Sequence, residues 1–184
     1  MDLAIPDNAK RIYKGHHIEL RNWEQKLFDD SVDTFEWLKI RDFVHTIVIR
    51  DDKILIAQEE QPWIGKFYSF VSGSIDDGYT PLAAAAKELE EEAGILSHDL
   101  KHIVSFNGTG VVVKIHVFIT RDFDETGIQK LEPGEKINLL RISFDELLTY
   151  MARDDRRAHD FNVRASKQYF ISGKHAEFKK LLLG

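Results

Sequence analysis

The sequence has no cysteine among its 184 residues, which excludes disulfides, thiolate zinc sites and a cysteine nucleophile. It also lacks any run of roughly 18–20 consecutive apolar residues, the length that a membrane-spanning helix requires. Residues 1–11 contain no apolar core of the kind that a signal peptide carries. These absences lead us to expect a cytoplasmic protein that has no membrane partner.

Positive charge is scarce as well. The net charge is −6, with 25 Lys and Arg against 31 Asp and Glu, and the basic residues form no stripe along the chain. Because binding to a nucleic-acid backbone depends on clustered positive charge, we expect no nucleic-acid partner. A small anionic substrate stays compatible with this balance if metal ions offset the local negative charge.

Most of the chain carries strand patterns, with alternating or β-branched apolar residues. Residues 1–40 predict a strand pair that bears an aromatic residue. Residues 43–59 predict a hairpin that turns at Asp51 and Asp52. Further strands are expected over residues 66–73, 100–106, 111–120 and 136–142.

Helices are expected in the middle and at the end of the chain. Ser143 and Glu146 have the spacing of a capping box, so a helix is predicted to begin there. The tail, residues 161–183, is predicted to be helical with a break near Gly173. With 43% hydrophobic residues the chain can bury one good core, so we expect a single domain over residues 1–184 with a mixed α/β fold.

The clearest helix is predicted over residues 81–93. Thr80 is a suitable N-cap, Pro81 suits the first helical position, and Gly94 is a natural left-handed stop. The residues between them are almost all strong helix formers. The apolar positions recur at helical spacing, which predicts that they share one buried face. They are Leu82, Ala85 or Ala86, Leu89 and Ala93.

This helix ends in a concentration of negative charge. Glu88, Glu91 and Glu92 stand at i, i+3 and i+4, so their carboxylates share a second face, whereas Glu90 points away from it. Like charges at this spacing and near a helix C-terminus are unfavourable, and the single Lys87 cannot neutralise them all. Two interpretations are open: a solvated acidic face, or a site for a hard divalent cation such as Mg²⁺.

The loop before the helix favours the cation. Taken together, residues 73–95 resemble the Nudix box, G-x5-E-x7-R-E-U-x-E-E-x-G-U, where U is aliphatic. Two positions differ, because Tyr79 replaces the first glutamate and Lys87 replaces the arginine. The matching positions are Gly73, Glu88, Leu89, Glu91, Glu92, Gly94 and Ile95.

The resemblance implies a fold, an activity and a cofactor. The implied fold is an α/β/α sandwich over residues 41–184, preceded by a strand extension over residues 1–40. The implied activity is hydrolysis of the diphosphate linkage in a nucleoside diphosphate derivative, with Mg²⁺ or Mn²⁺ as cofactor. By position, Glu88 and Glu92 correspond to direct metal ligands, and Glu91 to a catalytic residue that bridges a second ion or a water. The backbone carbonyl of Ser72 corresponds to a further ligand.

Outside the box, the layout is similar to that of the ADP-ribose and nucleoside-diphosphate-sugar pyrophosphatases. In that subgroup a loop glutamate assists catalysis, and either Glu135 or Glu132 corresponds to it. The subgroup also forms homodimers through the N-terminal extension, so a homodimer is expected here. Relatives carry a phosphate-contacting arginine in the segment that matches residues 57–63, where this chain has Glu59, Glu60 and Gln61.

Three aromatic residues are candidates for contact with the substrate base. Tyr79 lies in the box loop, and Trp63 and Tyr68 lie shortly before it. Each has two interpretations, stacking on a nucleotide base or packing within the protein.

A second function fits the same residues. A catalytically weak Nudix-like protein that binds or senses a nucleotide would also have Tyr79 and Lys87 in place of the usual pair.

Overall fold

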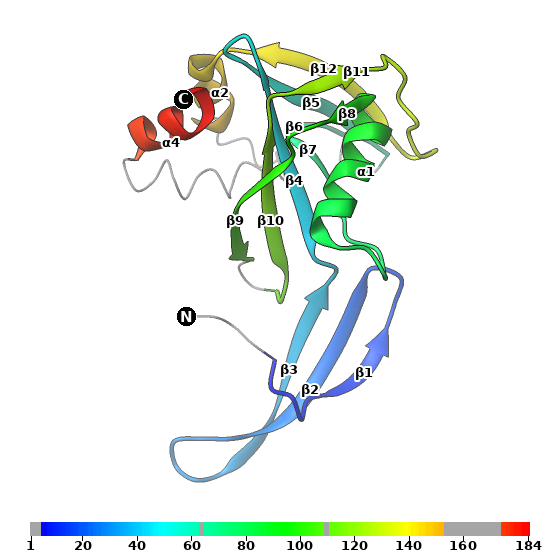
Figure 1. Ribbon diagram of the computed structural model, residues 1–184. Coiled ribbons are helices and arrows are strands. Elements are labelled where there is room, and N and C mark those ends of the chain that lie inside the picture. The colour runs from blue at the N-terminus through cyan, green and yellow to red at the C-terminus, as the bar shows by residue number, and fades with distance from the viewer. Residues whose placement is uncertain (1–4, 63–64, 109–110, 153–173) are drawn as a thin grey trace.

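The computed structural model describes residues 5–62, 65–108, 111–152 and 174–184 (Figure 1). The N-terminal extension contains three strands where the sequence predicted two. They are β1 (Lys10–Lys14), β2 (Ile18–Lys26) and β3 (Val32–Ile40). The three form an antiparallel sheet in the order β1-β2-β3, and it lies below the rest of the molecule in Figure 1.

A seven-stranded mixed sheet forms the centre of the molecule. Its main path runs β12-β5-β4-β10-β9, while β6 pairs with β5 and β7 pairs with β4. The β10–β4 pair is parallel, and the other pairs are antiparallel. The strands are β4 (Phe43–Arg50), β5 (Lys53–Gln61), β6 (Gly65–Ser69), β7 (Val71–Ser74), β9 (Lys101–Asn107), β10 (Lys114–Thr120) and β12 (Lys136–Ile142). A separate pair, β8 (Ile95–Ser97) and β11 (Phe123–Glu125), is antiparallel.

Helices cover both faces of this sheet. One face carries α1 (Pro81–Ala93), and the other carries α2 (Phe144–Ala152) and α4 (His175–Leu183) (Figure 1). The predicted mixed α/β sandwich is therefore confirmed. Residues 161–173 of the predicted tail helix lie outside the described residues. Every helix within the described ranges is too short or too polar to cross a bilayer.

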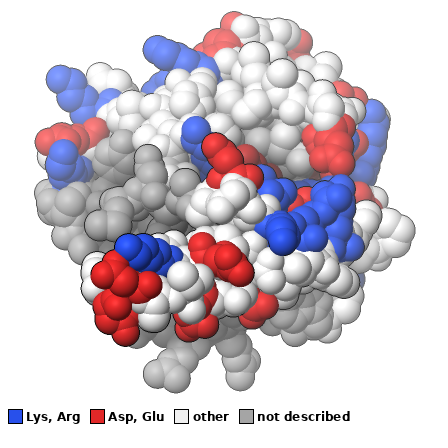
Figure 2. Space-filling model, turned by 90° about the horizontal axis from the view of Figure 1, so that it is seen from below, with Lys and Arg blue, Asp and Glu red and all other residues white. Residues whose placement is uncertain are grey.

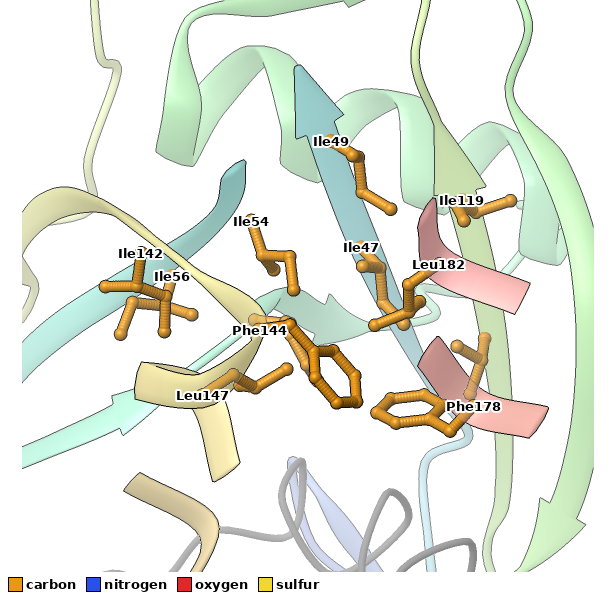
Figure 3. Packing of buried hydrophobic residues seen from close by; sticks show 12 residues of the cluster. Ile47, Ile49, Ile54, Ile56, Ile119, Ile142, Phe144, Leu147, Phe178 and Leu182 are labelled. Atoms are coloured by element: carbon orange, nitrogen blue, oxygen red, sulfur yellow. The ribbon is translucent and has the colours of Figure 1, made fainter. Parts of the chain in front are cut away.

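Apolar side chains fill the space between each helical layer and the sheet. On the α2 and α4 side, isoleucines of β4, β5 and β10 meet Phe144, Leu147, Phe178 and Leu182 (Figure 3). On the α1 side, Leu89 packs among Val48, Leu55 and Val71. The strands β4 and β5 are thus apolar on both faces, which explains their near-continuous hydrophobic sequences.

Local sequence signals set the ends of these elements. At the β4–β5 turn, Asp51 and Asp52 both have positive φ, 53° and 58°, as a two-residue hairpin turn requires. At the start of α2, the Ser143 hydroxyl accepts from the Glu146 backbone N–H, and the Glu146 carboxylate accepts from Ser143 N–H. The predicted hairpin and the predicted capping box are both confirmed.

The predicted helix over residues 81–93 has the predicted caps. The Thr80 hydroxyl accepts a hydrogen bond from the Ala83 N–H, and Gly94 has φ 62°. The predicted buried face is partly wrong, because Leu82 is 49% exposed. The buried side includes Ala84 and Glu92, so it is rotated away from Leu82, which lies at its edge.

Space-filling views show how charge is distributed on the side of the molecule seen from below. Basic and acidic side chains are interspersed there, and neither sign covers the face alone (Figure 2). That distribution agrees with the sequence, in which no basic stripe is present.

The two leucines of α1 allow a test of this packing. We expect Leu89→Ala to lower the free energy of unfolding by about 2–5 kcal/mol, because Leu89 is fully buried. We expect Leu82→Ala to change it by less than about 0.5 kcal/mol, since half of that side chain is exposed. Urea denaturation measures both. Equal losses would contradict the observed orientation of the helix.

Candidate functional site

The box loop, residues 73–80, contacts α1 at Gly73 on the helix face that carries Glu88. Gly73 lies in β7, which pairs with β4 and packs against α1. A Cβ atom on Gly73 would overlap the carboxyl group of Glu88. Only glycine therefore allows the Glu88 side chain to lie directly against the loop backbone.

Glu92 is held by Ser72, the residue before Gly73. Glu92 is only 4% exposed, and its Oε2 accepts a hydrogen bond from the backbone N–H of Ser72 at 2.9 Å. The structure thus brings Glu88, Glu92 and Ser72, three of the predicted metal-site residues, together beside β7.

Burial makes the charged forms of both glutamates costly. The pKa of Glu88 is raised from 4.5 to about 7, chiefly by burial, and the Glu91 and Glu135 carboxylates add to the effect. Burial likewise raises the pKa of Glu92 well above its usual value. The structure therefore holds two carboxylates in a place where a cation would relieve an electrostatic cost.

Glu91 is placed differently from its two neighbours. Its side chain is about one-third exposed, and its Oε2 lies 2.6 Å from the Nζ of Lys87. The same ammonium lies 3.9 Å from Oε1 of Glu88. Across the described residues, no three His, Asp or Glu side chains stand close enough together to hold a metal ion as they are. The i, i+3, i+4 spacing therefore does not by itself bring the three carboxylates into one cage.

A fourth carboxylate, Glu59, belongs to this cluster and was missed as a site residue. It lies in β5 with 7% exposure, and its Oε1 accepts a hydrogen bond from the Ser69 hydroxyl. After burial, its charge is the largest cause of the raised pKa of Glu92. Strand alternation carried the signal, because Leu55, Ala57 and Glu59 share one face of β5 and Leu55 packs on the α1 side.

The loop before β12 supplies Glu135 to the same region. Its carboxylate accepts from the backbone N–H of Glu132 at 2.9 Å, and its charge contributes to the raised pKa of Glu88 and of Glu92. A pocket of about 330 Å³ is lined by Glu135, Glu59 and Lys66, among others. Glu132 is exposed and does not line it. Of the two predicted alternatives, Glu135 is the one that lies near the helix carboxylates.

Tyr79 lines a second pocket, which is separate from the pocket beside Glu135. Tyr79 is 47% exposed, and the second pocket, also about 330 Å³, lies between the box loop, the β1–β2 turn and the end of β3. Nearby, Arg41 forms an ion pair with Asp76 at 2.5 Å. Residues of the N-terminal extension and of the box loop thus line the same pocket.

The other two aromatic candidates are not in this group. The Tyr68 hydroxyl accepts a hydrogen bond from the Gln58 side-chain amide at 2.8 Å. Its ring centroid lies 4.6 Å from that of Tyr150, and the side chain packs on the α2 and α4 core. Alternation along β6 puts it on the face of the sheet opposite to α1. Trp63 lies outside the described residues.

The residues present suit a hard divalent cation. The donors are carboxylate oxygens with a backbone segment beside them, as Mg²⁺ and Mn²⁺ prefer. The Glu88 carboxyl lies against the Gly73 backbone, and in the described part of the chain no cationic side chain forms an ion pair with Glu92. The residues that can hold such an ion are Glu88, Glu92 and, once separated from Lys87, Glu91.

Comparisons with known proteins identify the family of the chain. The NUDIX domain family matches residues 39–161. A methanol dehydrogenase activator of Bacillus methanolicus is 22% identical over 166 residues, which cover 88% of this chain and 89% of that protein. An ADP-ribose pyrophosphatase of Bacillus subtilis (strain 168) is 22% identical over 165 residues, covering 87% and 88% respectively.

A solved structure shares the fold. The crystal structure of an ADP compounds hydrolase superposes with a TM-score of 0.67 at 16% sequence identity. The match covers 91% of this chain and 95% of that one.

The raised pKa of Glu88 predicts a pH dependence of stability without metal. The folded protein binds more protons than the unfolded chain between about pH 4.5 and 7, so the free energy of unfolding falls as the pH rises through this window. The shift corresponds to at most roughly 3 kcal/mol. We expect Glu88→Gln to be more stable than wild type at pH 8 in EDTA, and to show a shallower pH slope.

Urea denaturation at pH 5, 6.5 and 8 measures this difference. Glu90→Gln is the matched control, because it removes the same charge from the same helix at an exposed position. We expect the control to keep the wild-type slope. A Glu88→Gln variant that also keeps it would contradict the assigned burial cost.

Proposed function

The chain belongs to the Nudix family, and from that premise we propose that it is a metal-dependent diphosphatase. The proposed reaction hydrolyses the diphosphate linkage of a nucleoside diphosphate derivative, of the ADP-ribose or nucleotide-sugar type. The products are a nucleoside monophosphate and a phosphorylated second product. The relatives named ADP-ribose pyrophosphatase and ADP compounds hydrolase support this class of substrate.

One observation carries the proposal: Glu92 is buried, and Glu88 is largely buried, against the Ser72–Gly73 backbone. Burying two like-charged carboxylates costs stability, because each loses hydration and each repels the other. A chain gains nothing structural from this arrangement that apolar residues would not supply better. A bound divalent cation would offset this cost, and a metal site therefore explains why the two carboxylates are placed here.

The proposed roles follow from these positions. Glu88 and Glu92 would hold the metal ion with the Ser72 carbonyl, and Glu91 would bind a second ion or a water. The chemistry that such an ion would supply is charge neutralisation at the phosphate and a lowered pKa for a water molecule. Glu135 accepts a proton from the attacking water, since it lies beside the helix carboxylates and lines the adjoining pocket.

For the substrate, we propose that the base stacks on Tyr79. The pocket that this residue lines is large enough for part of a nucleotide and adjoins the box loop. Half of the tyrosine ring is exposed, so stacking would bury apolar surface that is now in water. Substrate contact by Trp63 or Tyr68 stays a prediction.

A second candidate function is a nucleotide-binding or sensor protein with weak catalysis. The observation that favours it is the ion pair between Lys87 and Glu91, which engages one of the three carboxylates. The relative named methanol dehydrogenase activator is consistent with a role other than simple turnover.

Hydrolysis assays across a panel of nucleotide derivatives, with Mg²⁺ and with Mn²⁺, test the proposal. We expect release of a nucleoside monophosphate from ADP-ribose or a nucleotide sugar, and none in EDTA. We expect Glu92→Gln to lower kcat roughly 10²-fold or more, on the scale of removing one electrostatic element from a transition state.

The matched control is Glu90→Gln, which changes the same charge on the same helix. We expect its kcat to stay within a few-fold of wild type, because the Glu90 carboxylate points to Lys130 at the surface. Equal activity in two well-folded variants would refute the carboxylate site. Binding of a nucleotide derivative without turnover by wild type would favour the sensor function.

We also propose that residues 1–40 are a dimerisation extension of one domain with the core over residues 41–184. None of the residues in β1, β2 or β3 is fully buried, so this sheet has no core of its own. Apolar side chains on and beside it are exposed instead, which is typical of a contact surface. They include Ile12, Tyr13, Ile18, Phe28, Val32 and Phe35.

Sedimentation at micromolar concentration checks the dimer. We expect a species of about twice the 21.3 kDa chain mass. Phe28→Asp should shift it towards monomer, because a charge at this exposed apolar position opposes burial in an interface. Ile128→Asp is the control, because Ile128 is an exposed apolar residue outside the N-terminal extension. This variant should sediment like wild type. A wild-type monomer would overturn the proposal.

A further inference from the structure

Lys87 is placed among the carboxylates that the proposed metal ion requires. Its Nζ lies 2.6 Å from Oε2 of Glu91 and 3.9 Å from Oε1 of Glu88. In the part of the chain that the structure describes, no other basic side chain forms an ion pair with either glutamate. The lysine is therefore the local counterion of the carboxylate face.

Among the described residues, Lys87 forms ion pairs only with Glu88 and Glu91 of its own helix. Tyr79, near the end of the box loop, has no carboxylate to offer it. Asp76, the loop carboxylate whose charge reaches Lys87, is engaged by Arg41 at 2.5 Å. With that carboxylate occupied, the strongest partner left to Lys87 is Glu91, one turn further along the same helix.

We propose that Lys87 is a built-in competitor of the metal ion for Glu91. In the metal-free protein its ammonium group neutralises Glu91, and a divalent ion must displace it before all three helix carboxylates can bind. This inference rests on the proposed metal-dependent function. It adds that the metal affinity of this chain is lowered by its own lysine.

The physical basis is that one carboxylate cannot serve both cations at full strength. A lysine ammonium is a compact point charge on a flexible stem, so it can leave the carboxylate without disturbing the helix. Displacing the ammonium group breaks its ion pair with Glu91, and the displaced positive charge still repels the incoming metal ion. Both effects weaken metal binding, and both disappear when the lysine is neutral.

Titration of metal-free protein with Mn²⁺, followed by the electron paramagnetic resonance of free Mn²⁺, measures the affinity without any substrate. We expect Lys87→Gln to bind Mn²⁺ at least tenfold more tightly than wild type, which is about 1.4 kcal/mol. Thermal melts in EDTA should confirm that the variant folds, and the variant should show a larger rise in Tm with Mn²⁺.

Lys130→Gln is the matched control for net charge. Lys130 forms a 2.6 Å ion pair with the exposed Glu90 carboxylate of the same helix and none with Glu88 or Glu91, so this change removes the same charge and the same kind of pair. We expect its Mn²⁺ affinity to stay within about twofold of wild type. Lys87→Arg keeps the charge and offers a carboxylate-matching fork, so it should bind Mn²⁺ no more tightly than wild type.

Three results overturn the inference in distinguishable ways. Unchanged or weaker Mn²⁺ binding by Lys87→Gln refutes the competition, while the metal site stands if Glu92→Gln still loses Mn²⁺. Equal tightening in Lys87→Gln and Lys130→Gln assigns the effect to net charge and refutes the local role. Absence of Mn²⁺ binding in wild type and in Lys87→Gln at millimolar concentration refutes both the inference and the proposed metal site.

Discussion

The close approach of the box loop to α1 is the constraint on which the rest of the site depends. A glycine at position 73 leaves room for the Glu88 carboxyl group, and the Ser72 N–H fixes the Glu92 carboxylate. Both contacts require β7 to pair with β4 and α1 to pack across it, so the sheet order and the helix position serve one small region. The electrostatic cost of the buried glutamates is the price of that geometry, and the rigid scaffold around it keeps them in place.

Sequence reasoning succeeds here where a feature depends on neighbours in the chain. The caps at Thr80 and Gly94, the capping box from Ser143 and the turn at Asp51 follow rules of local backbone geometry, and the structure has all of them. Sequence patterns do not determine which face of an element is covered, because tertiary packing selects it. Leu82 lies at the edge of the buried side of α1. Tyr68, for which base stacking and packing within the protein were both open, packs on the α2 and α4 side.

The candidate site follows the same division. The spacing of Glu88 and Glu92 was enough to predict that they lie together, because i and i+4 share a helix face. Glu59 comes from a strand distant in sequence, and its inclusion depends on how β5 passes behind α1. The choice of Glu135 over Glu132 depends on the fold of a short loop. The pairing of Glu91 with Lys87, by contrast, follows from their i, i+4 spacing on one helix.

The parallel pairing of β4 with β10 has a consequence for the order in which the protein assembles. Phe43 pairs with Ile115, so this ladder closes a long segment that contains α1 and the whole box loop. A local helix forms within microseconds, whereas a pairing between such distant residues waits for loop closure. The β4–β10 ladder can therefore form only after the chain has been synthesised as far as Thr120, when β4, β7 and α1 have all been synthesised already. The parallel strand in the middle of the sheet is thus added to a unit whose carboxylate contacts all come from earlier residues.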